Sequence, residues 1–168
     1  MLEIDRLGED ASNITDFNLH NIGHLSSCTY LNLHCNRLRS LDGLPHSSLT
    51  SLTELNLSSN DFSSGCLPEL SHLPLLRILD LSANKLQRVV DLPFLPGLES
   101  LIIAHNIITN LDGLNDNAPN LIKLDVSIIY VSVISEPKLL RLLHYYTDTL
   151  IVQSSLLSSV SFFLLSES

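Results

Sequence analysis

Basic residues are scarce in this sequence. Only nine Lys and Arg stand among 168 residues, against 18 Asp and Glu, and the formal net charge is −9. Contacts to nucleic-acid phosphates or to an anionic membrane surface need clustered Lys and Arg side chains, whereas here these residues are scattered along the chain. The composition therefore argues against nucleic acid as a partner.

Cysteines and catalytic motifs are equally few. The three cysteines, Cys28, Cys35 and Cys66, form no C-x-x-C pair, and an odd number without a paired framework fits a reducing, cytoplasmic compartment better than secretion. The sequence contains no G-x-S-x-G motif, phosphate-binding loop or paired-carboxylate motif, and a zinc site would need three or four ligands at suitable spacing. We therefore expect no catalytic residues, no metal and no cofactor, and a protein that is not an enzyme.

Long uncharged runs are rare as well. The acidic N-terminus, MLEIDRLGED, has no basic region followed by an apolar run, so it does not read as a signal peptide. The one long uncharged stretch is residues 149–166, which would just span a bilayer, but six serines and a glutamine dilute it. We expect a loosely packed or poorly ordered tail there, with a membrane anchor as the weaker alternative.

Leucine at regular spacing is what the sequence has in abundance. The template L-x-x-L-x-L-x-x-N-x-L occurs four times, and its marker residues Leu31, Leu55, Leu79 and Leu101 are 24, 24 and 22 residues apart. A fixed period of this length with this template is the signature of leucine-rich repeats. The predicted fold class is α/β: a leucine-rich repeat solenoid with a curved parallel sheet on its concave side. So short a period leaves room only for short helical or 3-10 turns on the convex side.

Each template carries one asparagine behind its leucine pair. The chain must turn at the end of each strand, and an unpaired buried backbone group there would cost about 1–3 kcal/mol. An asparagine side chain offers both a donor and an acceptor to the turn. We therefore predict a buried asparagine ladder made of Asn36, Asn60, Asn84 and Asn106.

The repeats weaken toward both ends of the chain. Ile22 and Ile129 stand where the asparagine is expected, and terminal repeats are usually atypical because one face has no neighbour. After Ser135 the pattern changes to an amphipathic helix that would cap the last strand. The predicted organisation is an N-terminal segment and degenerate capping repeat (1–27), leucine-rich repeats (28–134), and a C-terminal helical cap or poorly ordered tail (135–168).

The outward side chains of the predicted strands form the candidate binding site. Extended concave surfaces are how solenoids bind other molecules, and this one is polar and mildly acidic with an apolar spot. We expect a protein or peptide partner with a basic patch, and the sequence indicates no oligomeric state. The predicted contact residues are Tyr30, Asn32, His34, Glu54, Asn56, Ile78, Asp80, Ile102 and Asp125.

The repeats resemble the short, intracellular class of leucine-rich repeats, with about 22 residues per unit, typified by the nuclear regulatory subunit of protein phosphatase 1. That class favours the LDGL turn, which occurs here at 41–44 and 111–114. Within the class, LNLHCNRLRSLDGL followed by LTELNLSSN is most similar to the centrosomal leucine-rich repeat and coiled-coil proteins. The resemblance covers about residues 14–126; no coiled coil follows, and the usual closing cap is not recognisable after Val126.

The resemblance implies a non-catalytic protein-interaction scaffold in the cytoplasm, at a centrosome or cilium. A regulatory subunit of a protein phosphatase or a similar enzyme is the alternative that it leaves open.

Overall fold

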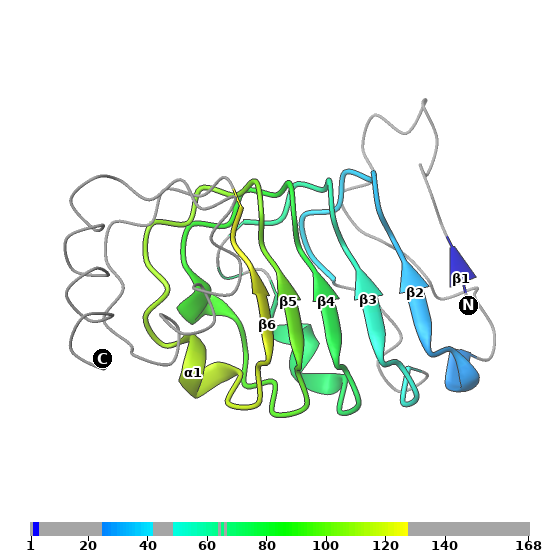
Figure 1. Ribbon diagram of the computed structural model, residues 1–168. Coiled ribbons are helices and arrows are strands. Elements are labelled where there is room, and N and C mark those ends of the chain that lie inside the picture. Colours follow the sequence, from blue (N-terminus) through cyan, green and yellow to red (C-terminus); the bar gives the residue numbers. More distant parts are fainter. Residues whose placement is uncertain (1, 4–24, 42–48, 64, 66, 128–168) are drawn as a thin grey trace.

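The computed structural model describes residues 2–3, 25–41, 49–63, 65 and 67–127. Its strands form one parallel sheet in which strands consecutive in the chain are neighbours in space (Figure 1). The segments that return from one strand to the next lie behind the sheet and include the short helical elements η3 (Pro68–His72), η4 (Val89–Asp91) and α1 (Leu114–Asn117). The six strands are β1 (Leu2–Glu3), β2 (Tyr30–Asn32), β3 (Glu54–Asn56), β4 (Ile78–Asp80), β5 (Ser100–Ile102) and β6 (Lys123–Asp125).

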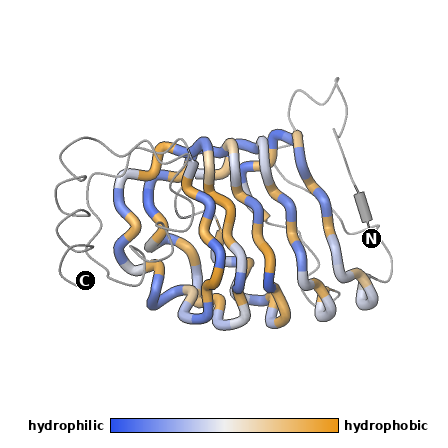
Figure 2. Tube along the Cα trace, in the orientation of Figure 1, coloured by the Kyte–Doolittle hydropathy of each residue, from blue (hydrophilic) through white to orange (hydrophobic). Residues whose placement is uncertain are grey.

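The middle residue of each strand from β2 to β6 is a leucine that points into the core. Side chains alternate along a strand, so the residues on either side of this leucine face outward. The leucines stand in register across the sheet and are at most 1% exposed. Figure 2 shows the resulting alternation of hydrophobic and hydrophilic segments along each coil. The row consists of Leu31, Leu55, Leu79, Leu101 and Leu124.

The parallel solenoid predicted from the leucine spacing is confirmed, but its strands are shorter than expected. The spacing predicts five-residue strands, such as 30–34, whereas each strand from β2 to β6 has three residues. Backbone bonding continues beyond each strand, for example from the N–H of Leu33 to the carbonyl of Asn56 at 2.8 Å. Three residues after the end of each strand from β2 to β5, the chain turns at a residue with positive φ; these residues are Cys35, Ser59, Ala83 and His105, with φ from 53° to 56°.

The residue after each left-handed turn is the asparagine of the template. Asn84 is 8% exposed, and its Nδ2 donates to the carbonyls of Leu81 and Ser82 in its own coil at 3.0 and 3.1 Å. The same Nδ2 donates to Leu57 of the preceding coil at 3.0 Å, while Oδ1 accepts the N–H of Phe62 at 3.0 Å. Each amide thereby joins two coils. The same four contacts recur at the other two buried amides, Asn60 and Asn106.

The first asparagine of the series differs from the other three. Asn36 is half-buried, and its Nδ2 donates to the carbonyls of Leu33 and His34 in its own coil at 2.9 and 3.1 Å. It therefore stabilises its own turn as the others do. The predicted buried ladder is therefore found at Asn60, Asn84 and Asn106, whereas Asn36 is only half-buried.

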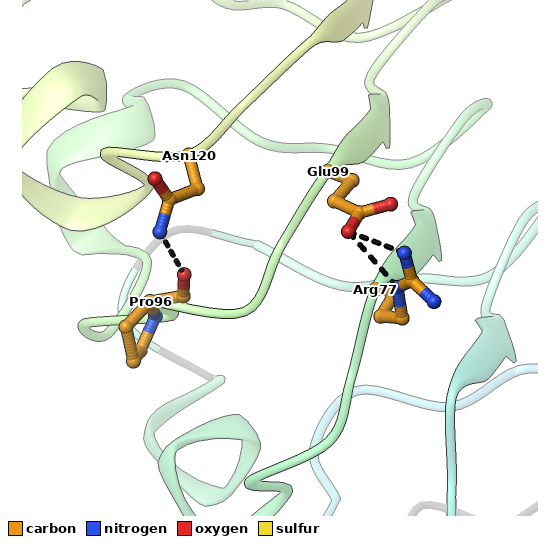
Figure 3. A network of polar contacts seen from close by, with 4 residues as sticks. All are labelled: Arg77, Pro96, Glu99 and Asn120. Atoms are coloured by element: carbon orange, nitrogen blue, oxygen red, sulfur yellow. Dashed lines mark hydrogen bonds and ion pairs between the residues drawn. The ribbon is translucent and has the colours of Figure 1, made fainter.

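Two further contacts join neighbouring coils where the strands begin (Figure 3). Nε and Nη2 of Arg77 donate to Oε1 of Glu99 at 3.0 and 2.5 Å. Nδ2 of Asn120 donates to the carbonyl of Pro96 at 2.9 Å. The Arg77 side chain is 58% exposed, so this ion pair contributes little to stability. These contacts lie at the surface, whereas the buried leucines and amides supply most of the stability.

The end of the sheet before β2 is formed by a strand that the leucine spacing did not indicate. β1 pairs parallel with β2, with Leu2 opposite Leu31 and Glu3 opposite Asn32. The sequence pattern instead indicated a degenerate repeat over residues 10–27, of which 10–24 lie outside the described residues. The helix predicted after Ser135 and the uncharged stretch at 149–166 also lie outside them.

Replacing Asn84 with Ala should lower the free energy of unfolding by roughly 1–3 kcal/mol, because the buried N–H of Phe62 loses its acceptor. The three carbonyls that Asn84 contacts each accept a second hydrogen bond, so they add less to the loss. Urea unfolding followed by circular dichroism measures the change.

The near-isosteric change Asn84→Asp is the matched control. It keeps the Oδ1 acceptor but turns a second oxygen toward three carbonyl oxygens, so it should destabilise the protein at least as much as Asn84→Ala. An aspartate variant as stable as the wild type would show that the amide donates nothing to the turn.

Candidate protein-binding face

The outward side chains of β2 to β6 and of the residues just after them form three rows across the sheet, which we call the concave face. All nine predicted contact residues lie on it. The first row is Tyr30, Glu54, Ile78, Ser100 and Lys123; the second row is Asn32, Asn56, Asp80, Ile102 and Asp125; the third row is His34, Ser58, Ser82, Ala104 and Ser127. The topology thus places on one face residues that are up to 97 positions apart in the chain, from Tyr30 to Ser127.

The polar residues of the second row bond the turn that follows them. Oδ1 of Asp80 accepts the N–H of Ser82 at 2.9 Å and its hydroxyl at 2.7 Å. Oδ1 of Asn56 accepts the same two groups of Ser58 at 2.9 and 2.6 Å. These side chains therefore help to end their own strands, which the sequence reasoning missed. The pattern repeats at Asp125 with Ser127 and, for the N–H alone, at Asn32 with His34.

This double role corrects one interpretation of the sequence. From the alternation of side chains alone, a charge reversal such as Asp80→Lys should leave the fold intact, since outward residues are not core. The structure shows that a lysine at this position would also remove the acceptor for Ser82. The recurring N-x-S and D-x-S triplets NLS, DLS and DVS were the signal for this contact.

The third row contains a link between coils. Nδ1 of His34 lies 2.7 Å from Oγ of Ser58, which in turn donates to Oδ1 of Asn56 at 2.6 Å. Ser58 is only 5% exposed. The hydroxyl is therefore held from two sides. This geometry orients His34, one of the predicted contact residues, across the gap between its own coil and the next.

The fourth coil departs from the polar pattern at two positions together. Ile102 stands where the other coils have Asn or Asp, and Ala104 stands where three of them have Ser. Neither side chain can form the hydrogen bonds of that turn. Ile78, which is 37% exposed, lies diagonally beside Ile102 on β4. The two isoleucines form the apolar spot of the concave face, which is otherwise polar.

The charges on the concave face are mostly negative. Glu54 is exposed, and Asp80 and Asp125 are half-buried, while Lys123 supplies the one ammonium group of the described strands. None of these four side chains forms a salt bridge within the described part of the chain; the three ion pairs found there, such as Lys85 with Asp61, lie off this face. Their charges are therefore directed to solvent or to a partner.

The described residues were also compared with what a metal site and a membrane-spanning helix require. Within them, no three His, Cys, Asp or Glu side chains gather closely enough to hold a metal ion. None of the helical elements among these residues has the length and apolar character needed to cross a bilayer. Cys28 is buried and its Sγ lies 3.1 Å from the carbonyl of Tyr30, as suits a small core residue.

The comparison with protein families agrees with this geometry. Residues 26–86, which include β2, β3 and β4, match the model of the leucine rich repeat family. The fold is a leucine-rich repeat solenoid. Such solenoids use extended surfaces to bind other proteins, and the match points to an interaction module and to no enzyme family. No curated protein matches the chain.

Within this leucine-rich repeat solenoid, Asp80→Ala should lower the free energy of unfolding by about 1–2 kcal/mol, since the N–H and hydroxyl of Ser82 lose their acceptor. Asp80→Asn should stay within about 0.5 kcal/mol of the wild type, because Asn56 makes the same contacts with Ser58. Thermal and urea unfolding of both variants check this. An asparagine variant as unstable as the alanine variant would contradict the role of Oδ1.

Proposed function

We propose that this protein is a non-catalytic scaffold that binds a partner protein or peptide on its concave face. The observation that carries this proposal is the continuous set of three outward rows, in which exposed Glu54 and Ile78 stand side by side in register. Interface energy concentrates in a few apolar or aromatic anchors. Tyr30, Ile78 and Ile102 are suited to that part.

The charge of this face supports a partner with a basic patch. Three carboxylates stand on it against one ammonium group, and the whole chain carries a formal charge of −9. Opposite charges speed the encounter of two proteins, and this effect weakens as the ionic strength rises. Binding should therefore be faster at low salt than at high salt.

The cellular place of the scaffold is a proposal that rests on the resemblance of its repeats. That resemblance favours a cytoplasmic site at a centrosome or cilium. A regulatory subunit of a protein phosphatase or similar enzyme is the second candidate, on the same ground. Affinity capture with the full chain separates the two: recovery of centrosomal structural proteins favours the first, and recovery of a phosphatase catalytic subunit favours the second.

The charge reversal Glu54→Lys tests the face itself. Glu54 is exposed, and its side chain forms no hydrogen bond or ion pair within the described residues, so the change should leave the fold intact. We expect partners captured by the wild-type chain to be retained about 10-fold less well, which corresponds to about 1.4 kcal/mol. Quantitative mass spectrometry of the captured proteins gives the measurement.

Asp116→Lys is the matched control for that experiment. Asp116 lies in α1, away from the strands, and is exposed like Glu54. The change in charge is the same, so capture should match the wild type. If both variants lose the same partners, or only Asp116→Lys does, the partner contacts another surface and the proposal is wrong.

A further inference from the structure

The second row of the concave face places an apolar residue between two carboxylates. Asp80 is in register with Ile102 on the next strand, and Ile102 is in register with Asp125 on the strand after it. Adjacent strands lie about 4.8 Å apart, so the two carboxylates are separated by about 10 Å. They cannot ligate one metal ion together, because metal–oxygen bonds measure about 2.0–2.6 Å.

Each of these carboxylates has one oxygen in use and one oxygen open. Oδ1 of Asp80 accepts the N–H and the hydroxyl of Ser82 at 2.9 and 2.7 Å. Oδ1 of Asp125 accepts the same groups of Ser127 at 2.9 and 2.6 Å. An oxygen of an ionised carboxylate has about two acceptor positions, so both Oδ1 atoms are filled. Neither Oδ2 atom accepts a hydrogen bond from the described residues.

The filled Oδ1 atoms restrict which cation fits. An arginine guanidinium binds a carboxylate most strongly as a fork, with one N–H on each oxygen. On Asp80 that fork would find one oxygen already occupied by Ser82. A lysine ammonium is a compact charge that needs a single oxygen. Its hydrocarbon stem can lie along apolar surface while the head stays polar, and Ile102 with Ile78 offers that surface.

We propose that the concave face binds a lysine-bearing, extended segment of its partner protein, with the lysine stem on Ile102 and the ammonium group on Oδ2 of Asp80. The hydroxyl of Ser82 then makes the face prefer lysine to arginine. Asp125 is the weaker of the two acceptors, because Lys123 lies two residues before it on the same face of β6. This inference rests on the proposed function and adds the chemistry of the partner.

Two fluorescent peptides test the preference. Both consist of Gly and Ser, and one carries Lys-Ser-Leu-Ser-Lys where the other carries Arg-Ser-Leu-Ser-Arg. Anisotropy titrations with the full chain at low salt should show the lysine peptide binding about 5-fold more tightly, a difference of about 1 kcal/mol. Asp80→Asn should weaken the lysine peptide about 10-fold, because it removes the charge but keeps the contact to Ser82. Asp125→Asn should weaken it less.

Ser82→Ala separates the selectivity from the charge. It frees one acceptor position on Oδ1 of Asp80, so the arginine peptide should gain affinity and the preference for lysine should fall toward about 1-fold. A merely structural role of Ser82 would weaken both peptides equally. Asp116→Asn removes one negative charge away from the face and should leave both affinities unchanged. Circular dichroism and urea unfolding of every variant establish that the compared proteins are folded.

The outcomes distinguish this inference from the proposed function. Equal or tighter binding of the arginine peptide by the wild type overturns the inference, as does no binding of the lysine peptide at about 1 mM. An Asp80→Asn variant that binds the lysine peptide as the wild type does also overturns it. In each case the proposed function stands if Glu54→Lys still loses partners that Asp116→Lys retains.

Discussion

Backbone groups at the end of each strand are the constraint on which this structure depends. The chain turns out of the sheet through a left-handed residue, such as Ala83 with φ 53°, and that conformation costs about 1–2 kcal/mol for a residue other than glycine. The following asparagine satisfies the turn from inside the core, as Asn84 does with four contacts. Because two of these contacts lie within its own coil and two reach the preceding coil, the amides set both the turn and the spacing of the coils.

The same residues of the concave face serve the fold and the proposed binding. Asp80 ends its strand through Oδ1 and turns Oδ2 away from that contact. A side chain fixed in this way loses little conformational freedom when a partner binds, which is the advantage of preorganisation. For mutagenesis, we expect large changes in the second row to disturb the turn and an exchange of Asp for Asn to be tolerated, because Asn56 and Asp80 make the same contacts.

The fourth coil shows how a repeat can vary without losing its place in the solenoid. Ile102 and Ala104 give up the polar contact of the turn, yet β5 keeps its pairing with β4 and β6. The buried Leu101 and the amide of Asn106 suffice to hold the coil. The variation therefore falls on the exposed face, where it creates an apolar spot between acidic positions, and not in the core.

The sequence by itself determined the solenoid, its strand positions and its ladder residues, because each coil repeats one local solution to the same packing problem. The counterparts of Leu79 and of Asn84 in the other coils have similar neighbours. The spacing alone therefore predicts the surroundings of these positions. Other features depended on the tertiary structure. β1 pairs with β2 through two residues that carry no repeat signal, and the bond between His34 and Ser58 joins positions 24 residues apart. The open oxygen of Asp80 likewise follows from the turn geometry around Ser82. Contacts between coils are set by how the turns stack, which no single repeat encodes.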